Sequence, residues 1–184
     1  MLFPSDGLET QRLKLQLIDE SFAEDIFREL TSDVAKYMST PLPNKVEDTI
    51  NRIRSTIQKI NNGEEIVVVW IDKISNEFIG IRWLHKISSG HPEPWLWTKK
   101  QNSLWKGWIG KEWLIEFIDW VQKNLEFDYL TFYIDENNKP SQKLGAAIWW
   151  IADIDEEGNK IILKSATSLG NELNLVKYKL AKKA

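Results

Sequence analysis

The order in which helices and strands follow one another is the sequence feature that most narrows the fold. Between residues 46 and 60, Val and Ile recur at steps of four and three, which predicts an amphipathic helix capped near Asn44 and Glu47 and closed by Asn62-Gly63. Residues 66–71 then form a continuous run, IVVVWI, and residues 78–84 a second strand after a turn at 73–76. A long helix followed at once by a hairpin indicates helices layered on a sheet.

The rest of the chain continues this alternation. The apolar pattern predicts strands at 10–18, 95–98 and 129–134, and helices at 21–31 (with a capping box at Ser21 and Glu24), at 109–124 and from 140 to about 148. The tail predicts two strands around a turn at 157–159 and a last strand near 173–180. No internal repeat and no linker-like run interrupts the 184 residues, so we predict one α+β or α/β domain over 1–184.

The composition excludes several classes of function. The sequence has no Cys, which rules out disulfide scaffolds, thiolate zinc sites and Cys nucleophiles, and its two His residues argue against a His-rich metal centre. A net charge of −3 argues against a general nucleic-acid binder. The N-terminus lacks the pattern of a signal peptide and no apolar run is long enough for a membrane span, so we expect a cytoplasmic protein without metal, nucleic-acid or membrane partners.

Tryptophan is unusually frequent, with 10 residues against 9 Gly. Trp is bulky and costly to expose, so these side chains are expected to line a core, a pocket or an interface. Trp70, Trp113 and Trp120 fall on predicted core faces, whereas Trp95 and Trp97 belong to a second group with Trp105 and Trp108.

Residues 105–112 read Trp-Lys-Gly-Trp-Ile-Gly-Lys-Glu and connect a predicted strand to a predicted helix. Free backbone N–H groups and the helix dipole favour anions at such a position, and two Gly and two Lys suit a phosphate or pyrophosphate. The alternative interpretation is an ordinary loop with solvated lysines.

Several strings in this order resemble the GNAT acetyltransferase superfamily, in particular its RimJ/RimL-like branch. They are Glu9-Thr10-Gln11-Arg12-Leu13, Lys36-Tyr37-Met38 before Pro41, Glu77-Phe78-Ile79-Gly80-Ile81, Gly110-Lys111-Glu112 and Asn138-Lys139-Pro140-Ser141. The resemblance spans about 8–150, with strands in 149–182 completing the domain. It implies an α+β fold with a central mixed, mostly antiparallel sheet and helices on both faces.

The resemblance also implies an activity, transfer of an acetyl group from acetyl-CoA to an amine. It implies that the strands at 95–98 and 129–134 splay apart and that the pantetheine arm pairs with Trp97 and Thr98. It places the pyrophosphate on the loop before the helix at 109–124, and Asn138 and Ser141 near the thioester. The implied phosphate-binding residues are Lys106, Gly107, Trp108, Ile109, Gly110 and Lys111.

Direct attack of a neutral amine on the thioester needs a base for the ammonium proton and an acid for the leaving thiolate. Glu93 is the candidate base, acting through a water, and Ser141 and Tyr133 are the candidate acids. The alternatives are a solvated loop carboxylate for Glu93, a helix N-cap for Ser141 and a core-packed ring for Tyr133.

The sequence departs from the family pattern at positions usually held by small residues. The acetyl-CoA loop is degenerate, because Trp108 replaces the first glycine and Trp105 the usual Gln or Arg, and Trp149-Trp150 falls where a helix commonly ends in a glycine-containing turn. Two functional interpretations follow. One is an N-acetyltransferase that acts on a protein N-terminus or a small primary amine in a ternary complex. The other is a catalytically degraded relative that binds another ligand or partner through a Trp-lined cleft; a homodimer through exposed Trp is a third possibility.

Overall fold

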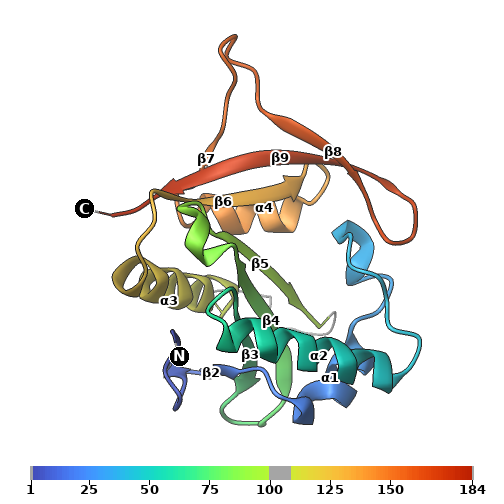
Figure 1. Cartoon of the computed structure of the whole chain (residues 1–184). Coiled ribbons are helices and arrows are strands. Elements are labelled where there is room, and N and C mark those ends of the chain that lie inside the picture. The colour runs from blue at the N-terminus through green and yellow to red at the C-terminus, as the bar shows by residue number, and fades with distance from the viewer. Residues whose placement is uncertain (1, 100–108, 184) are drawn as a thin grey trace.

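A computed structural model describes residues 2–99 and 109–183 (Figure 1). The first sheet is antiparallel and contains five strands in the spatial order β1 (Leu8–Glu9), β2 (Leu13–Leu17), β3 (Ile66–Asp72), β4 (Phe78–His85) and β5 (Glu93–Thr98). The predicted hairpin is confirmed, since β3 pairs with β4 from Ile66 opposite Leu84 to Ile71 opposite Phe78.

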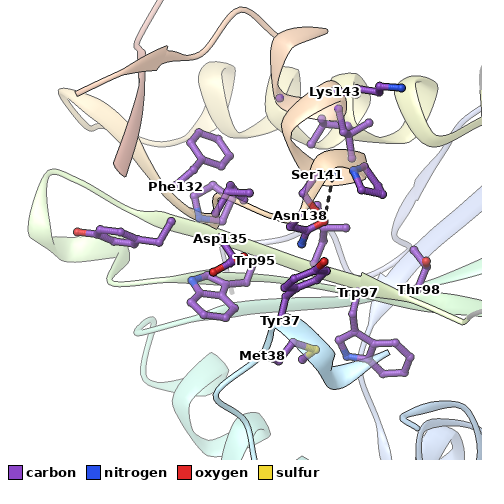
Figure 2. Close-up of a pocket in the computed structure, with 18 of the residues that line it drawn as sticks. Tyr37, Met38, Trp95, Trp97, Thr98, Phe132, Asp135, Asn138, Ser141 and Lys143 are labelled. Carbon is purple, nitrogen blue, oxygen red and sulfur yellow. Dashed lines mark hydrogen bonds between the residues drawn. The ribbon is translucent and has the colours of Figure 1, made fainter. Parts of the chain in front are cut away.

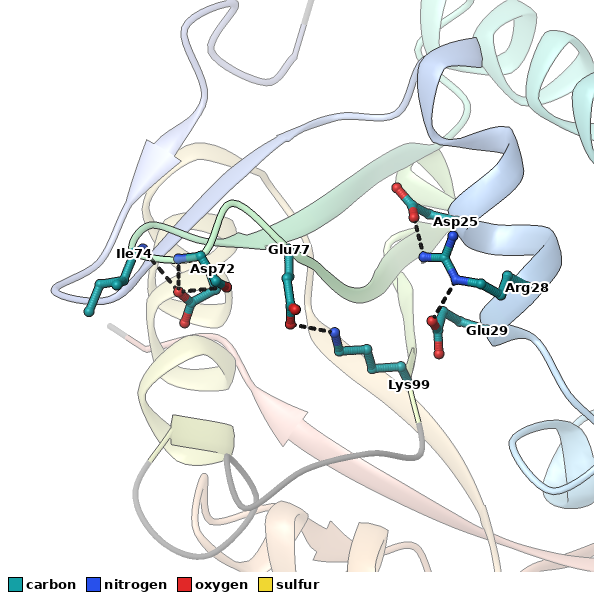
Figure 3. Close-up of polar contacts among 8 residues, drawn as sticks. Asp25, Arg28, Glu29, Asp72, Ile74, Glu77 and Lys99 are labelled. Carbon is teal, nitrogen blue, oxygen red and sulfur yellow. Dashed lines mark hydrogen bonds and ion pairs between the residues drawn. The ribbon is translucent and has the colours of Figure 1, made fainter.

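Polar contacts close the turn between β3 and β4 and tie down the end of β5 (Figure 3). The Asp72 carboxylate accepts hydrogen bonds from the backbone N–H groups of Ile74 and Ser75, both at 2.9 Å. These bonds, led by the one from Ser75, lower the pKa of Asp72. Lys99, directly after β5, donates to Glu77 at 2.9 Å and so fixes the end of β5 to the start of β4.

The second sheet is built around β9 (Glu172–Ala181), the long strand that crosses the top of Figure 1. One edge of β9 pairs with β6 (Tyr129–Asp135), and its other edge pairs with β8 (Ile162–Ala166) and β7 (Ile151–Ala152). The chain between β7 and β8 projects from this sheet as an arm whose two sides are joined by a bridge between Ile154 and Lys160. The strands predicted in the tail are therefore confirmed.

Helices cover both faces of the first sheet, as the resemblance implied. Val67, Val69 and Ile81 point to one face and pack with the apolar side chains of α1 (Ala23–Glu29) and α2 (Val46–Asn61). Val68 and Leu84 point to the opposite face and pack with α3 (Ile109–Asn124). Burial on both faces explains why IVVVWI is apolar throughout. The short helix α4 (Lys139–Ala146) follows β6.

Two helix caps differ from the predicted ones. At the first helical segment the cap is Asp19, whose carboxylate accepts from the backbone N–H of Ser21 at 2.8 Å. At α2 the Asp48 carboxylate accepts from the backbone N–H groups of Asn44 and Lys45 at 2.9 and 3.3 Å. In both cases a carboxylate takes the place predicted for another side chain, because negative charge is favoured at a helix N-terminus.

The strands β5 and β6 run side by side only where they begin. The backbone N–H of Thr131 donates to the carbonyl of Pro92 at 2.9 Å, and that of Asp128 donates to the carbonyl of Gly90 at 2.9 Å. Beyond this point β5 continues its pairing with β4, and β6 continues its pairing with β9. The two strands consequently diverge toward Thr98 and Asp135, and the space between them becomes the site described below.

Trp149 has a left-handed backbone conformation with φ +66°, and its side chain is 82% exposed. This conformation costs an L-residue about 1–2 kcal/mol and costs glycine almost nothing. We expect Trp149→Gly to raise the free energy of unfolding by about 1 kcal/mol, since little apolar burial is lost. Urea denaturation measures the change. Trp149→Ala is the matched control, because it removes the indole but keeps the strained Cβ; an equal gain in both variants would contradict the explanation.

Candidate functional site

A cavity of about 840 Å³ occupies the space between the diverging strands (Figure 2). Its two long walls are formed by residues 94–98 of β5, with Lys99 directly after it, and by residues 132–135 of β6. The segment 33–38 between α1 and α2 lines one end, and α4 with Trp150 lines the other. Its volume is in the range of small-molecule sites.

The predicted pantetheine contacts, Trp97 and Thr98, both line this cavity. The Trp97 indole is only 6% exposed and packs against Phe78, with ring centroids 5.7 Å apart. What Trp97 offers to a ligand is therefore mainly its backbone. Since β5 is the last strand of the first sheet, its second edge is turned toward the cavity. An exposed strand edge carries N–H and C=O groups that match the amides of an extended ligand.

The predicted phosphate-binding segment is divided between two regions. Ile109, Gly110 and Lys111 form the first turn of α3, which begins at the predicted residue. The remaining predicted residues, Lys106, Gly107 and Trp108, lie outside the described residues, as does Trp105.

Asn138 and Ser141 lie together on the α4 side of the cavity. The Asn138 side-chain oxygen accepts from the backbone N–H of Ser141 at 3.3 Å, so Asn138 is the N-cap of α4 (Figure 2). The alternative prediction that Ser141 is the cap is wrong. Ser141 lies inside the first turn, where its hydroxyl is not used to cap the helix.

Asp135 is a buried residue of this site that the sequence analysis missed. It is 3% exposed, and its two carboxylate oxygens accept from the backbone N–H groups of Asn137 and Asn174, at 2.9 and 2.8 Å. These bonds fix the tight turn that leads from β6 to Asn138 and join it to β9. The sequence does carry a signal for Asp135, because it ends a strand and comes shortly before the capping Asn138. Asp side chains in such positions accept hydrogen bonds from backbone N–H groups two residues on.

One of the three candidate catalytic residues, Glu93, is paired with a lysine. Glu93 is the first residue of β5 and is not among the residues that line the cavity, which on β5 begin at its neighbour Pro94; its carboxylate accepts from Lys86 Nζ at 2.7 Å. Its side chain is only 14% exposed, so Glu93 is not the solvated carboxylate of the alternative prediction. The pKa of Lys86 is raised, chiefly by this hydrogen bond, with a smaller contribution from Tyr133. Tyr133 lines the cavity from β6, whereas Ser141 lies on its α4 side.

Tyr37 is a second residue that the sequence analysis did not include among the site residues. It ends the 3₁₀ turn Ala35–Tyr37 and lines the cavity on the side opposite α4 (Figure 2). Its hydroxyl donates to the backbone carbonyl of Asn137 at 3.1 Å. This bond links segments 100 positions apart and joins segment 33–38 to the turn that follows β6. No pattern local to either segment could have indicated it.

A buried carboxylate lies behind the β5 wall. Glu65, 8% exposed, accepts from Lys59 Nζ at 3.0 Å, from His85 Nδ1 at 3.1 Å and from Trp83 Nε1 at 3.2 Å. Burial by itself would raise the pKa of Glu65, but the three hydrogen bonds together outweigh burial and lower it. The carboxylate therefore holds two ring systems of β4 in fixed positions.

The lowered pKa of Glu65 predicts how stability depends on pH. Because the folded-state pKa lies below that of the unfolded chain, the ionised carboxylate stabilises the fold near neutral pH, and this contribution is lost as the pH falls through the folded-state pKa. We expect wild type to be more stable than Glu65→Gln at pH 7 and the difference to shrink below pH values of about 4.5. Denaturant titrations over pH measure it. The exposed neighbour Glu64→Gln is the control, and a difference that is constant with pH would contradict the assignment.

Over residues 2–99 and 109–183, no helix combines the length and apolar character needed to cross a membrane. The same residues contain no group of three or more His, Asp or Glu side chains arranged to hold a metal ion.

Comparisons with known proteins agree with this geometry. No curated protein matches the chain in sequence. Its fold is shared by the microcin C7 self-immunity acetyltransferase MccE in complex with acetyl-CoA and AMP (15% identity, TM-score 0.79, covering 98% of each chain). It is also shared by the ribosomal-protein-S5-alanine acetyltransferase from Vibrio fischeri (15% identity, TM-score 0.76, 96% of each chain). The spermidine N-acetyltransferase from Vibrio cholerae, in complex with CoA and spermine, is similar as well (10% identity, TM-score 0.74, 94% of this chain and 97% of that one). The sequence profile of the acetyltransferase (GNAT) domain matches residues 12–148, which is most of the chain, and the protein therefore belongs to the GNAT family of N-acetyltransferases.

Proposed function

We propose that the protein transfers an acetyl group from acetyl-CoA to a primary amine, on a protein N-terminus or a small molecule, by direct transfer in a ternary complex. The observation that carries the proposal is the cavity between β5 and β6, which runs along an exposed strand edge and reaches Asn138 and Ser141 on its other side.

The residues present fit acetyl-CoA as the donor. The edge of β5 at Trp97 and Thr98 would hold the amides of the pantetheine arm, and Gly110 and Lys111 at the start of α3 would lie toward the phosphates. Bound acetyl-CoA supplies an activated acyl carbonyl. The sequence contains no Cys that could form a covalent acyl-enzyme, which favours direct attack by the amine.

The side chains of the site are assigned to two proton transfers. Glu93 takes a proton from the acceptor ammonium through a water, while Lys86 holds its carboxylate in place. The neutral nitrogen then forms the C–N bond as the C–S bond breaks, and the second proton that the nitrogen loses replaces the one that the acid gives to the sulfur. The Ser141 hydroxyl donates a proton toward the leaving sulfur, and Tyr133 is the alternative donor. Asn138 positions Ser141 by accepting from its backbone N–H.

We expect Ser141→Ala to lower kcat about a hundredfold, as for the loss of a proton donor, and to leave the Kd for acetyl-CoA near that of wild type. Single-turnover kinetics and calorimetry separate the two quantities. Ser165→Ala, a half-buried serine on β8, is the control for general effects of the substitution. An unchanged kcat in Ser141→Ala would remove Ser141 from the mechanism and leave Tyr133 as the candidate acid.

Acetyl-CoA binding is the experiment that tests the proposal as a whole. Calorimetry with Trp fluorescence alongside is expected to give a micromolar Kd and a fluorescence change, because Trp95, Trp97 and Trp150 line the cavity. Absence of binding at millimolar acetyl-CoA would overturn the proposal. It would favour the second interpretation, a relative without catalysis that uses the same Trp-lined cavity for another ligand.

A further inference from the structure

The end of the cavity that faces α1 and α2 is aromatic. Trp95 of β5, Tyr133 of β6 and Tyr37 of the 3₁₀ turn all line the cavity, and each is half-buried (Figure 2). On β5, Trp95 lies on the same face as Glu93, and on β6 Tyr133 lies on the face opposite to the core residue Phe132. The three rings therefore come from three segments that enclose the end of the cavity opposite to Ser141.

The Trp95 ring is held by a chain of contacts that begins in the buried carboxylate. Glu65 binds the ring nitrogens of Trp83 and His85, and these two rings are stacked, with centroids 5.8 Å apart and planes 8° from parallel. The edge of His85 packs against Trp95 at 6.4 Å, with planes at 88°. Because each contact fixes the next ring, Trp95 is positioned before a ligand arrives, which reduces the entropy lost on binding.

Tyr37 is positioned in a similar way on the facing side. Its hydroxyl is bound to the Asn137 carbonyl, and Lys36 Nζ lies 4.9 Å from the centre of its ring. The orientation of Tyr37 is therefore set by a hydrogen bond and a cation–π contact. A ligand ring entering between the two walls would find fixed aromatic surfaces on both.

The carboxylates around this end already have partners. Glu93 is paired with Lys86, Glu65 with Lys59, and Asp153 with both Lys177 and Lys179 at 2.9 Å. Asp135 is satisfied by two backbone N–H groups, and Asp33 has a partner as well. Lysines therefore neutralise Glu93, Glu65 and Asp153, and Asp135 is engaged by backbone N–H groups. The two lysines on Asp153 add positive charge beside Tyr133.

We infer that the acceptor is an amine carried by an aromatic group, which packs against Trp95 and Tyr37, and that polycationic amines are poor acceptors. This inference rests on the proposed acetyl transfer. Offset and edge-to-face ring contacts supply affinity in such a site, and a single ammonium is sufficient for the reaction. A polyamine would bring further charges against these aromatic rings, and their desolvation would oppose binding.

A panel of three amines tests the inference, with 2-phenylethylamine as the aromatic acceptor, propylamine as its truncated form and spermidine as the polycation. The CoA thiol released is measured with a thiol reagent, and the chain has no Cys to interfere. We expect kcat/KM for 2-phenylethylamine to exceed that for each of the others at least tenfold. Equal or higher kcat/KM for spermidine or propylamine would overturn the inference.

Binding separates this inference from the proposed function. Calorimetric titration of 2-phenylethylamine into the protein alone and into its mixture with CoA needs no turnover. Binding at least tenfold tighter than that of spermidine supports an aromatic site even if acetyl-CoA fails to bind, in which case only the proposed function fails. Absence of 2-phenylethylamine binding under both conditions overturns the inference, whatever acetyl-CoA does.

Substitution of the central ring gives the residue-level test. Trp95→Leu is expected to raise the Kd for 2-phenylethylamine about tenfold and to leave propylamine unaffected, while Trp95→Phe, which keeps an aromatic ring, stays within about threefold of wild type. Trp149→Leu is the matched control, since this indole is exposed and outside the cavity. An unchanged Kd for 2-phenylethylamine in Trp95→Leu would overturn the role of Trp95 in binding the aromatic group. If Trp95→Phe binds normally, the loss in Trp95→Leu is not caused by a general folding defect.

Discussion

Gly145→Ala is expected to lower the free energy of unfolding by about 3 kcal/mol and to weaken acetyl-CoA binding. A Cβ at position 145 would overlap the indole of Trp150. That indole has nowhere to move, because it packs edge-on against Phe132 with centroids 4.7 Å apart and stacks on Tyr178 at 5.0 Å. Relief requires α4 to shift away from the second sheet, and α4 carries Ser141 and lines the cavity.

Urea denaturation and acetyl-CoA titration measure the two effects of Gly145→Ala. The double variant with Trp150→Leu is expected to recover part of the lost stability, since the smaller side chain makes room for the new Cβ. Gly158→Ala is the control, because a Cβ there meets no atom within 4 Å and costs only the strain of its φ of +84°. A loss in the double variant equal to the sum of the single losses would show that the overlap with Trp150 is not the cause.

Asp135→Ala is expected to cost about 3–5 kcal/mol of stability, because two hydrogen bonds to a buried carboxylate are lost and two backbone N–H groups are left without their acceptor. The turn into α4 also loses the hydrogen bonds that hold it, so we expect kcat to fall even at temperatures where the variant is fully folded. Denaturant titration and steady-state kinetics at a temperature where both proteins are folded measure the two losses.

Asp155→Ala is the matched control for Asp135→Ala. Asp155 also accepts from two backbone N–H groups, those of Glu157 and Asn159 at 3.0 and 2.8 Å, but it lies exposed on the projecting arm. There water replaces the lost acceptor, so we expect a cost below about 1 kcal/mol. Equal costs at the two positions would show that burial of Asp135 is not what makes it important.

Elements with strong local patterns were predictable from the sequence. In α2 the apolar residues recur at steps of three and four because one face of the helix is buried. In β3 the run IVVVWI is apolar throughout because both faces of the strand are buried. A short stretch of sequence is therefore enough to identify each element as a helix or a strand. The left-handed backbone at Trp149 was not predicted, although the sequence analysis noted that Trp149-Trp150 falls where a glycine-containing turn is common.

The contacts that shape the site were not predictable, because they join residues that are distant in the sequence. The hydroxyl of Tyr37 meets the Asn137 carbonyl, and Glu65 meets His85 across two strands, only after the sheets have formed. Asp135 has a local signal, but its second oxygen binds Asn174, 39 positions away. Single residues of the site were therefore visible in the sequence, whereas their positioning depends on tertiary structure.

The divergence of β5 and β6 has a consequence for folding. Past the bond between Thr131 and Pro92, the two sheets are not joined strand to strand, so an extended ligand bound along β5 would act as an additional strand between them. Such a ligand binds only the folded chain, which couples its concentration to the unfolding equilibrium. In a cell, the supply of the acetyl donor would then influence how long the protein survives as well as how fast it works.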